Sequence, residues 1–270
     1  MIIAGLSNSK KLAEGIARRL NVDYDDLILK DSRDGELHVK FHCDIKGKKV
    51  ALVQSLYPYP NHSFFETMYA ASAARDLGAK EIILVAPYLA FFREDSRNGK
   101  GECVQQNIAT DLFNRNFDAV LSVEPHLHQH NLLGKFSIPF YRLECNELLR
   151  KYTKDNFSEY RVIGFGERAW KLAKHIDKKA ALYEKGDEAE YSDKVLVVDD
   201  IIASGNSMLA NLENLKADKI NLLAVHGLFN GDSFSKLKQK AAGIVSCNTV
   251  QHESNKIDVS SLIAGKLMEI

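Results

Sequence analysis

The chain has few cysteines, and none of them forms a close pair. Its 270 residues include only four, Cys43, Cys103, Cys145 and Cys247, with no Cys-x-x-Cys motif. Such wide spacing argues against a secreted domain that is stabilised by disulfide bonds. The sequence also lacks the ligand pattern of a structural zinc site. A chain of this length buries enough of its surface to fold without such staples. We therefore expect reduced thiols, as in a cytosolic protein.

An excess of charge and a long apolar run are also missing. Lys and Arg together number 36, as do Asp and Glu, so the formal net charge is zero. This balance argues against non-specific nucleic-acid binding as the main role. No apolar run approaches the length that crosses a bilayer, and Met1–Leu6 has no basic segment before its apolar residues. We expect an unprocessed, cytoplasmic protein without a nucleic-acid or membrane partner.

Two widespread catalytic motifs are absent as well. The sequence contains no Gly-x-x-x-x-Gly-Lys-[Ser/Thr] loop, which excludes a P-loop as the way of binding ATP. It also contains no Gly-x-Ser-x-Gly motif, the nucleophile elbow of many hydrolases. A Gly/Ser-rich linker is missing too, so we expect the domains of the chain to pack closely on each other.

The chain does contain a regular alternation of strand-like and helical patterns. Short aliphatic runs predict strands, and apolar residues at helical spacing predict helices. In the first half we expect strands at 2–6, 50–54, 81–86 and 119–123, and helices at 10–20, 64–77 and 103–113. In the second half we expect strands at 161–164, 180–183, 195–198 and 220–226, and helices at 147–152, 168–176 and from 208 onward. The pattern predicts an α/β protein with mostly parallel sheets, divided into domains of residues 1–145 and 146–270.

The most informative segment is the acid-pair loop, residues 199–207. Four aliphatic residues, 195–198, predict a buried parallel strand, and Asp199 and Asp200 come where that strand is expected to end. Small residues follow, and then a helical pattern begins. Backbone N–H groups of such a loop, together with a helix N-terminus, can hold a phosphate. The carboxylates can hold sugar hydroxyls or a magnesium ion. This segment therefore predicts a site for a phosphorylated sugar.

The acid-pair loop resembles the signature loop of phosphoribosyl-handling proteins, and other segments narrow the resemblance. In chain order the full set resembles ribose-phosphate pyrophosphokinases, which make phosphoribosyl pyrophosphate. The segments that carry the resemblance are 32–37, 87–95 with 101–102, 123–126, 199–207, 224–229 and 247–250. The resemblance implies two type I phosphoribosyltransferase-like domains, each a mostly parallel sheet flanked by helices. It also implies transfer of the diphosphoryl group of ATP to the anomeric hydroxyl of ribose 5-phosphate.

The resemblance implies a role for each matching residue. In the second domain Asp199 and Asp200 would hold the ribose hydroxyls, with Asp199 on a magnesium ion. The 5-phosphate would lie on the loop formed by Ala203, Ser204, Gly205, Asn206 and Ser207.

On the ATP side, Arg93 would contact the phosphates, and Asp95 lies in the same segment. His126 would help to bind magnesium. Asp34 and Glu36 match residues that bind adenine from a neighbouring subunit, which implies a homo-oligomer.

The chain departs from the family at two catalytic positions. Lys185 matches a catalytic lysine, but Asp187 replaces the second cation of that loop. Segment 162–169 lacks the usual acidic diphosphate-binding loop, and it fits a dinucleotide fingerprint by spacing alone. A substitute for the missing cation could be Arg97, Arg168 or Lys171. Two alternatives stay open: a phosphoribosyltransferase that consumes phosphoribosyl pyrophosphate, and a non-catalytic regulatory homologue.

Overall fold

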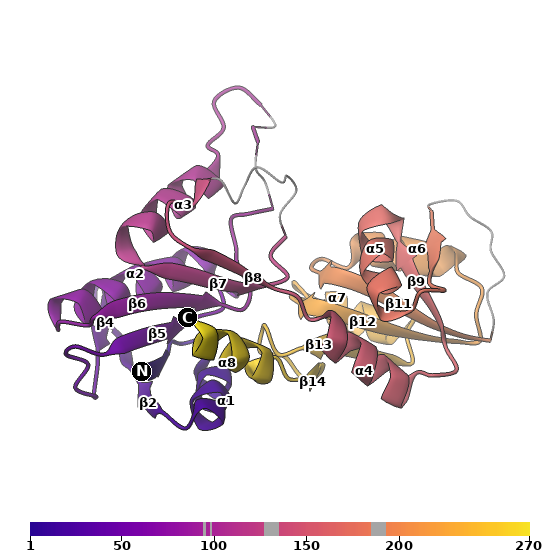
Figure 1. Cartoon of the computed structure of the whole chain (residues 1–270). Helices are drawn as coiled ribbons and strands as arrows, with labels where there is room; N and C mark the ends of the chain where they lie inside the picture. The colour runs from indigo at the N-terminus through magenta and orange to yellow at the C-terminus, as the bar shows by residue number, and fades with distance from the viewer. Residues whose placement is uncertain (94–95, 98, 127–134, 185–192) are drawn as a thin grey trace. The chain divides into compact units, whose positions relative to one another are not determined.

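The protein folds into two compact units. The computed structural model describes residues 1–93, 96–97, 99–126, 135–184 and 193–270. Unit 1 comprises residues 1–143 and 260–270, and unit 2 comprises residues 144–259 (Figure 1). Each unit is built on a six-stranded parallel sheet, and unit 1 also carries a two-stranded hairpin. No helix of the described chain is both long enough and apolar enough to cross a membrane.

The sheet of unit 1 has the strand order β2-β1-β5-β6-β7-β8. Its strands are β1 (Ile2–Gly5), β2 (Asp23–Asp26), β5 (Lys49–Val53), β6 (Glu81–Ala86), β7 (Ala119–Val123) and β8 (Phe140–Leu143). The helices of this unit are α1 (Lys10–Leu20), α2 (Pro60–Asp76), α3 (Gln105–Asn116) and α8 (Ser260–Glu269). The hairpin consists of β3 (Ile28–Asp31) and β4 (Leu37–Lys40), which pair antiparallel.

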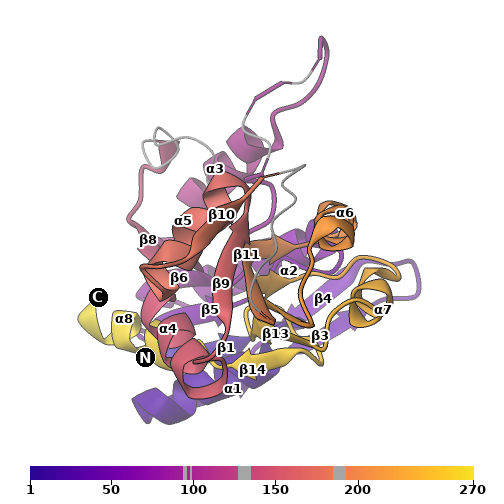
Figure 2. The same ribbon diagram turned by 90° about the vertical axis from the view of Figure 1, so that its right-hand side faces the viewer.

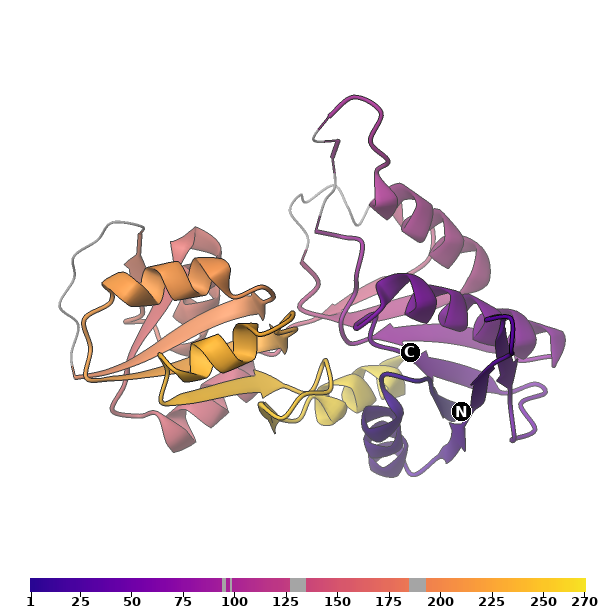
Figure 3. The ribbon, with the colours of Figure 1, turned by 180° about the vertical axis from the view of Figure 1, so that it is seen from behind.

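The strand order explains which face each helix covers. From β1 the chain moves through α1 to the edge strand β2, whereas α2 and α3 lead in the opposite direction, to β6 and β7. Because parallel crossovers are right-handed, this reversal places α1 on one face of the sheet and α2 and α3 on the other. Figure 3 shows α1 and α8 below the sheet and α2 above it.

Unit 2 repeats this topology with different residues. Its sheet has the order β10-β9-β11-β12-β13-β14. The strands are β9 (Arg161–Phe165), β10 (Ala181–Tyr183), β11 (Lys194–Ile202), β12 (Lys219–Gly227), β13 (Gly243–Cys247) and β14 (Asn255–Ile257). The helices are α4 (Asn146–Asn156), α5 (Gly166–Ile176), α6 (Asn206–Asn214) and α7 (Ser233–Lys238). Helices α5 and α6 lie on opposite faces of the sheet (Figure 2).

Most predicted elements are present, and the differences have physical causes. The strand predicted at 195–198 runs on to Ile202, because β12 continues to pair with it there. The acid pair therefore lies inside β11 rather than after it. Strands β2, β3, β4, β8, β13 and β14 and helices α7 and α8 were not predicted. Most of these elements are short or at a sheet edge, where periodicity is weak.

The division of the chain also differs at the C-terminus. The chain passes from unit 1 to unit 2 after Leu143, two residues from the predicted boundary. Residues 260–270 return to unit 1, whereas the sequence predicts them in the second domain. Helix α8 buries Ile263, Ala264 and Leu267, and Arg19 of α1 donates a 2.6 Å hydrogen bond to the Ser260 hydroxyl. The helix belongs to unit 1 because its apolar face packs on α1.

Candidate functional site

The acid pair of unit 2 lies where the strand order of the sheet reverses. Strand β11 pairs with β9 only as far as Val198, opposite Gly164, whereas its pairing with β12 continues to Ile202. Asp199 and Asp200 therefore follow the last residue of β11 that pairs with β9, at the edge of the sheet where β9 turns into α5. In open α/β sheets, ligands bind outside the carboxyl ends of the strands at such a reversal. The fold thus gives the acid pair the position of a ligand site.

The two carboxyl groups influence each other. The Asp200 amide donates a 2.8 Å hydrogen bond to Asp199 Oδ1. Burial of its carboxyl group and the neighbouring charge of Asp200 raise the pKa of Asp199 well above its ordinary value, and Arg168 opposes this shift. Two close, poorly solvated carboxylates favour an added cation or hydroxyl donors, which stabilise the ionised pair. The site therefore suits a sugar diol or a divalent metal ion.

A cation from the opposite side of the reversal contacts the pair. Arg168, in the first turn of α5, places Nε 2.8 Å from Asp200 Oδ2. Gly164 permits this approach, because a Cβ at this position would overlap the backbone nitrogen of Trp170. Gly164 thus allows close packing of α5 on β9. The third glycine of the Gly-x-Gly-x-x-Gly motif has this role in dinucleotide-binding folds.

The loop after β11 presents backbone N–H groups and hydroxyls at the start of α6. Gly205 has φ +69°, a left-handed conformation that L residues adopt at a cost, and it ends the turn just before Asn206. Ala203 anchors the loop, because its carbonyl accepts hydrogen bonds from the Asn230 amide and the Ser233 hydroxyl. Ser204 and Ser207 are exposed. This arrangement is that of an anion-binding helix start.

Beside this loop the surface of unit 2 is hollowed. The hollow has a volume of about 710 Å³. Its lining residues come from the end of β9, the end of β10 and the first turns of α6: Phe165, Gly166, Tyr183, Glu184, Asn206, Ser207, Ala210 and Asn211. That volume lies within the range of about 300–1,000 Å³ typical of small-molecule sites. The predicted phosphate residues Asn206 and Ser207 thus face a space that accommodates a sugar phosphate.

Unit 1 brings two of the predicted ATP-side residues into one hollow. Arg93 and His126 are separated by 33 positions in the sequence, yet both line a space of about 680 Å³. Its other lining residues are Pro60, Asn61, Tyr88, Ala90, Phe91 and Gln105. Asn61 and Gln105 belong to no motif in the sequence, so no role was predicted for them. A guanidinium and an imidazole in a polar hollow can bind phosphate oxygens.

Left-handed backbone conformations surround this hollow. Tyr59, Phe91 and Glu124 have φ values of 59°, 72° and 37°. Such conformations are costly for residues other than glycine, and they gather at functional sites. Glu124 is held by Arg142, whose Nη2 donates a 2.9 Å hydrogen bond to its carboxylate. This ion pair fixes the turn that carries His126, two residues further on.

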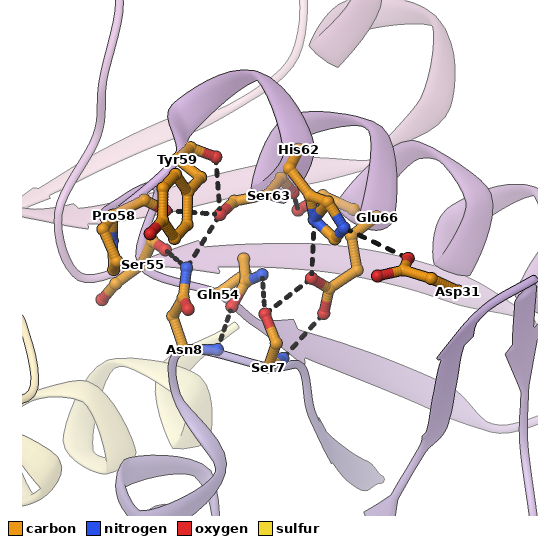
Figure 4. A network of polar contacts seen from close by, with 11 residues as sticks. Ser7, Asn8, Asp31, Gln54, Ser55, Pro58, Tyr59, His62, Ser63 and Glu66 are labelled. Carbon is orange, nitrogen blue, oxygen red and sulfur yellow. Dashed lines mark hydrogen bonds and ion pairs between the residues drawn. The ribbon is translucent and has the colours of Figure 1, made fainter. Parts of the chain in front are cut away.

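The strand reversal of unit 1, between β1 and β5, is filled by polar side chains of the protein itself (Figure 4). Buried Glu66 of α2 accepts hydrogen bonds from the Ser7 amide at 2.7 Å and the Ser7 hydroxyl at 2.6 Å. Gln54 accepts from the Asn8 amide, and Asn8 donates to the Ser63 hydroxyl. Because these groups satisfy one another, unit 1 does not offer here the open site that unit 2 has between β9 and β11.

The same network reaches the hairpin that carries Asp34 and Glu36. His62 Nε2 lies 3.5 Å from Asp31 at the end of β3, and its Nδ1 lies 4.0 Å from Glu66. Asp34 and Glu36 themselves are exposed in the β3–β4 turn and do not line the Arg93 hollow. The Ser32 hydroxyl donates to Asp34 and holds the pKa of that carboxyl below its ordinary value. The residues predicted to bind adenine are thus held by the turn of the hairpin. They lie outside the hollow that contains Arg93 and His126, the residues predicted on the phosphate side.

Two predicted site residues, Asp95 and Lys185, lie outside the described residues, as does Asp187. Within the part of the chain that the structure describes, no three His, Cys, Asp or Glu side chains gather as a metal site. A magnesium ion at Asp199 or His126 would therefore need substrate or water oxygens to complete its coordination. This is how magnesium commonly binds in nucleotide-dependent enzymes.

Comparisons with known proteins find relatives that are named ribose-phosphate pyrophosphokinases. Residues 1–116 match the family described as the N-terminal domain of ribose phosphate pyrophosphokinase. The ribose-phosphate pyrophosphokinase of Thermoplasma acidophilum is 28% identical over 98% of this chain and 99% of its own. The enzyme of the same name from Aquifex aeolicus is 28% identical over 97% of this chain and 91% of its own.

A solved structure shows the same fold. The crystal structure of phosphoribosylpyrophosphate synthetase from Mycobacterium smegmatis superposes with a TM-score of 0.85. The superposition covers 99% of this chain and 97% of that one, at 20% identity. Both the prediction of an α/β fold with two domains and the predicted resemblance are confirmed.

Proposed function

We propose that this chain, which is similar over almost its whole length to ribose-phosphate pyrophosphokinases, converts ATP and ribose 5-phosphate into phosphoribosyl pyrophosphate and AMP. The observation that carries the proposal is the acid pair at the strand reversal of unit 2, followed by an anion-binding loop. These features suit the two ends of one substrate, a sugar diol and a phosphate.

We assign the ribose 5-phosphate site to unit 2. Asp199 and Asp200 accept hydrogen bonds from the ribose hydroxyls, and backbone N–H groups of residues 203–207 bind the 5-phosphate. The hydroxyls of Ser204 and Ser207 donate to the same phosphate. Holding both ends of the sugar orients its anomeric hydroxyl, which is the acceptor of the reaction.

We assign the ATP phosphates to the hollow of unit 1 that contains Arg93 and His126. Asp95, and from a neighbouring copy of the chain Asp34 and Glu36, are proposed as further ATP-side residues, which makes the active form a homo-oligomer. Lys185 is proposed as a catalytic cation. Because the substrate is ATP, we place the activity in the cytoplasm.

Magnesium is the metal that these residues fit. Each unit offers one donor for such an ion, the Asp199 carboxylate in unit 2 and the His126 imidazole in unit 1, so phosphate or ribose oxygens would complete the coordination in either place. When bound, the ion neutralises charge on the phosphates.

The proposed reaction is an in-line transfer. The anomeric oxygen forms a bond to the β-phosphorus of ATP, and the bond from that phosphorus to the oxygen bridging the α-phosphate breaks. AMP leaves with the electron pair, and the hydroxyl proton passes to solvent. Phosphoryl transfer of this kind depends on positioning and charge neutralisation rather than on a protein nucleophile.

Phosphorus NMR of the protein with magnesium, ATP and ribose 5-phosphate tests the proposal. We expect AMP and phosphoribosyl pyrophosphate to appear in equal amounts. Arg93→Ala and Lys185→Ala should each reduce the rate by about 10²–10³-fold, since each removes a cation from the transferring phosphates. Unchanged ATP with the wild-type protein would refute the proposal. A parallel assay with phosphoribosyl pyrophosphate and free bases then detects a transferase instead.

A further inference from the structure

The proposed transfer needs positive charge next to the acceptor, where this chain departs from the family that it resembles. The diphosphoryl group carries several negative charges while it moves between AMP and the sugar. Asp187 stands where the family has a second loop cation. The sequence left three candidates to replace it, Arg97, Arg168 and Lys171, and the structure distinguishes among them.

Lys171 is paired with another residue, and Arg97 belongs to the unit that does not carry the acid pair. Lys171 lies on α5 and forms a 2.6 Å ion pair with Glu167 of the same helix, and both side chains are well exposed. Arg97 belongs to unit 1 and is exposed. Neither of these two residues contacts a proposed substrate-binding residue in the part of the chain that the structure describes.

Arg168, in contrast, is fixed at the acid pair. Its Nε lies 2.8 Å from Asp200 Oδ2, and the Asp200 side chain is only 13% exposed, whereas that of Arg168 is 41% exposed. The carboxylate is thus held inside the fold while part of the guanidinium faces solvent at the strand reversal. An arginine bonded through Nε keeps further N–H groups of its planar fork for a second anion.

The structure of ribose explains why the position of Arg168 at Asp200 matters. The anomeric hydroxyl of ribose is adjacent to the 2-hydroxyl, one of the two hydroxyls that the acid pair is proposed to hold. A cation attached to Asp200 is therefore beside the oxygen that receives the diphosphoryl group. The 5-phosphate, at the other end of the sugar, is assigned to residues 203–207.

We propose that Arg168 is the catalytic cation of unit 2, that it contacts the diphosphoryl group as this group reaches the anomeric oxygen, and that Asp200 positions it. The inference rests on the proposed function. The short turn between β9 and α5 replaces the acidic diphosphate-binding loop of the family with an arginine, which compensates for Asp187.

Steady-state kinetics of AMP formation tests this role with Arg168→Ala, Arg168→Lys and Arg168→Gln. Lys171→Ala is the matched control, since it removes a cation of the same helix that contacts no proposed substrate-binding residue. We expect Arg168→Ala to lower kcat by about 10²–10³-fold, with the KM for ribose 5-phosphate within about threefold of wild type. Arg168→Lys should recover about tenfold of the loss, and Lys171→Ala should keep kcat within about twofold.

Two further readouts separate a chemical from a structural role. Millimolar guanidinium should partly restore the activity of Arg168→Ala if the missing group is a catalytic cation. If Arg168 had only a structural role, added guanidinium would not restore activity. If Arg168→Ala does not fold, Arg168→Gln carries the test, because glutamine keeps a donor for Asp200 but lacks the charge. Wild-type kcat in a folded Arg168→Ala or Arg168→Gln variant would overturn this inference and leave the proposed function intact. An inactive wild-type protein would overturn the proposed function and this inference together.

Discussion

At the scale of single residues, buried carboxyl groups serve two different purposes in this protein. Asp199 and Asp200 lie at the strand reversal of unit 2, contacted there by Arg168. Glu66 lies at the corresponding reversal of unit 1, where Ser7 donates two hydrogen bonds to it. The first arrangement leaves carboxylates for a ligand, whereas the second uses a carboxyl group to close the site.

Glu66 should make the stability of the protein depend on pH. Burial raises its pKa above the ordinary value of 4.5. As the pH rises past that value, the unfolded chain releases this proton first, so the free energy of unfolding falls until the folded-state pKa is passed. Glu66→Gln removes the ionisation and keeps the shape. Urea denaturation from pH 4.5 to 7 should show this variant gaining stability relative to wild type as the pH rises.

The control for this prediction is Glu14→Gln. Glu14 is an exposed residue of α1 that pairs with Arg18 at 3.0 Å, so its stability difference from wild type should stay within about 0.5 kcal/mol at every pH. A constant difference between Glu66→Gln and wild type over the same range would show that Glu66 ionises alike in the folded and unfolded chains.

At the scale of elements, the contact between β9 and α5 near the site leaves no room for a side chain at Gly164. A side chain at Gly164 would overlap the backbone of Trp170, which a helix cannot avoid without moving. We predict that Gly164→Ala lowers the free energy of unfolding by about 1–3 kcal/mol, as overpacking usually does. It should also reduce the rate of AMP formation, because displacement of α5 moves Arg168 from Asp200.

Gly265→Ala is the comparison for Gly164→Ala. Gly265 lies in α8 with no atom within 4 Å of the position of an added Cβ. Alanine there should stabilise the helix by about 0.5–1 kcal/mol and leave activity unchanged. Thermal unfolding and the NMR assay measure both effects. Wild-type stability and activity in Gly164→Ala would mean that α5 does not require this close approach.

At the scale of the whole molecule, one topology is used twice, and the end of the chain returns to the first unit. Helix α8, yellow in Figure 1, packs on α1, and the Lys49 ammonium donates a 2.7 Å hydrogen bond to a main-chain oxygen of Ile270. Unit 1 therefore depends on a segment that follows all of unit 2. Its folding requires contacts between residues more than 200 positions apart, which close slowly.

This dependence can be measured because Trp170, the single tryptophan, belongs to unit 2. Ile263 of α8 is fully buried, so Ile263→Ala should destabilise unit 1 by about 2–4 kcal/mol. In urea the transition measured by circular dichroism should begin at a lower concentration, whereas the Trp170 fluorescence transition should move less. Met268→Ala, at a position 71% exposed, should change neither. Equal shifts of both transitions would assign α8 to the stability of both units.

The sequence by itself determined what depends on neighbouring residues. Helix α1 and strands β6 and β7 have the predicted bounds, because apolar periodicity and short aliphatic runs are local properties. The acid-pair loop was recognised for the same reason, since the strand, the two acids and the small residues are consecutive. The candidate ribose phosphate site was therefore predictable without a structure.

The tertiary structure decided what depends on residues far apart in the chain. Arg168 could be selected from the three candidate cations only because β9 ends beside β11, which brings it to Asp200, 32 positions away in the sequence. Asn61 and Gln105 joined Arg93 only because α2 and α3 begin at the same hollow. The place of α8 in unit 1 follows from packing on α1, which its own sequence does not specify. Side-chain partners across a sheet reversal or a helix interface leave no local pattern, so only the folded chain reveals them.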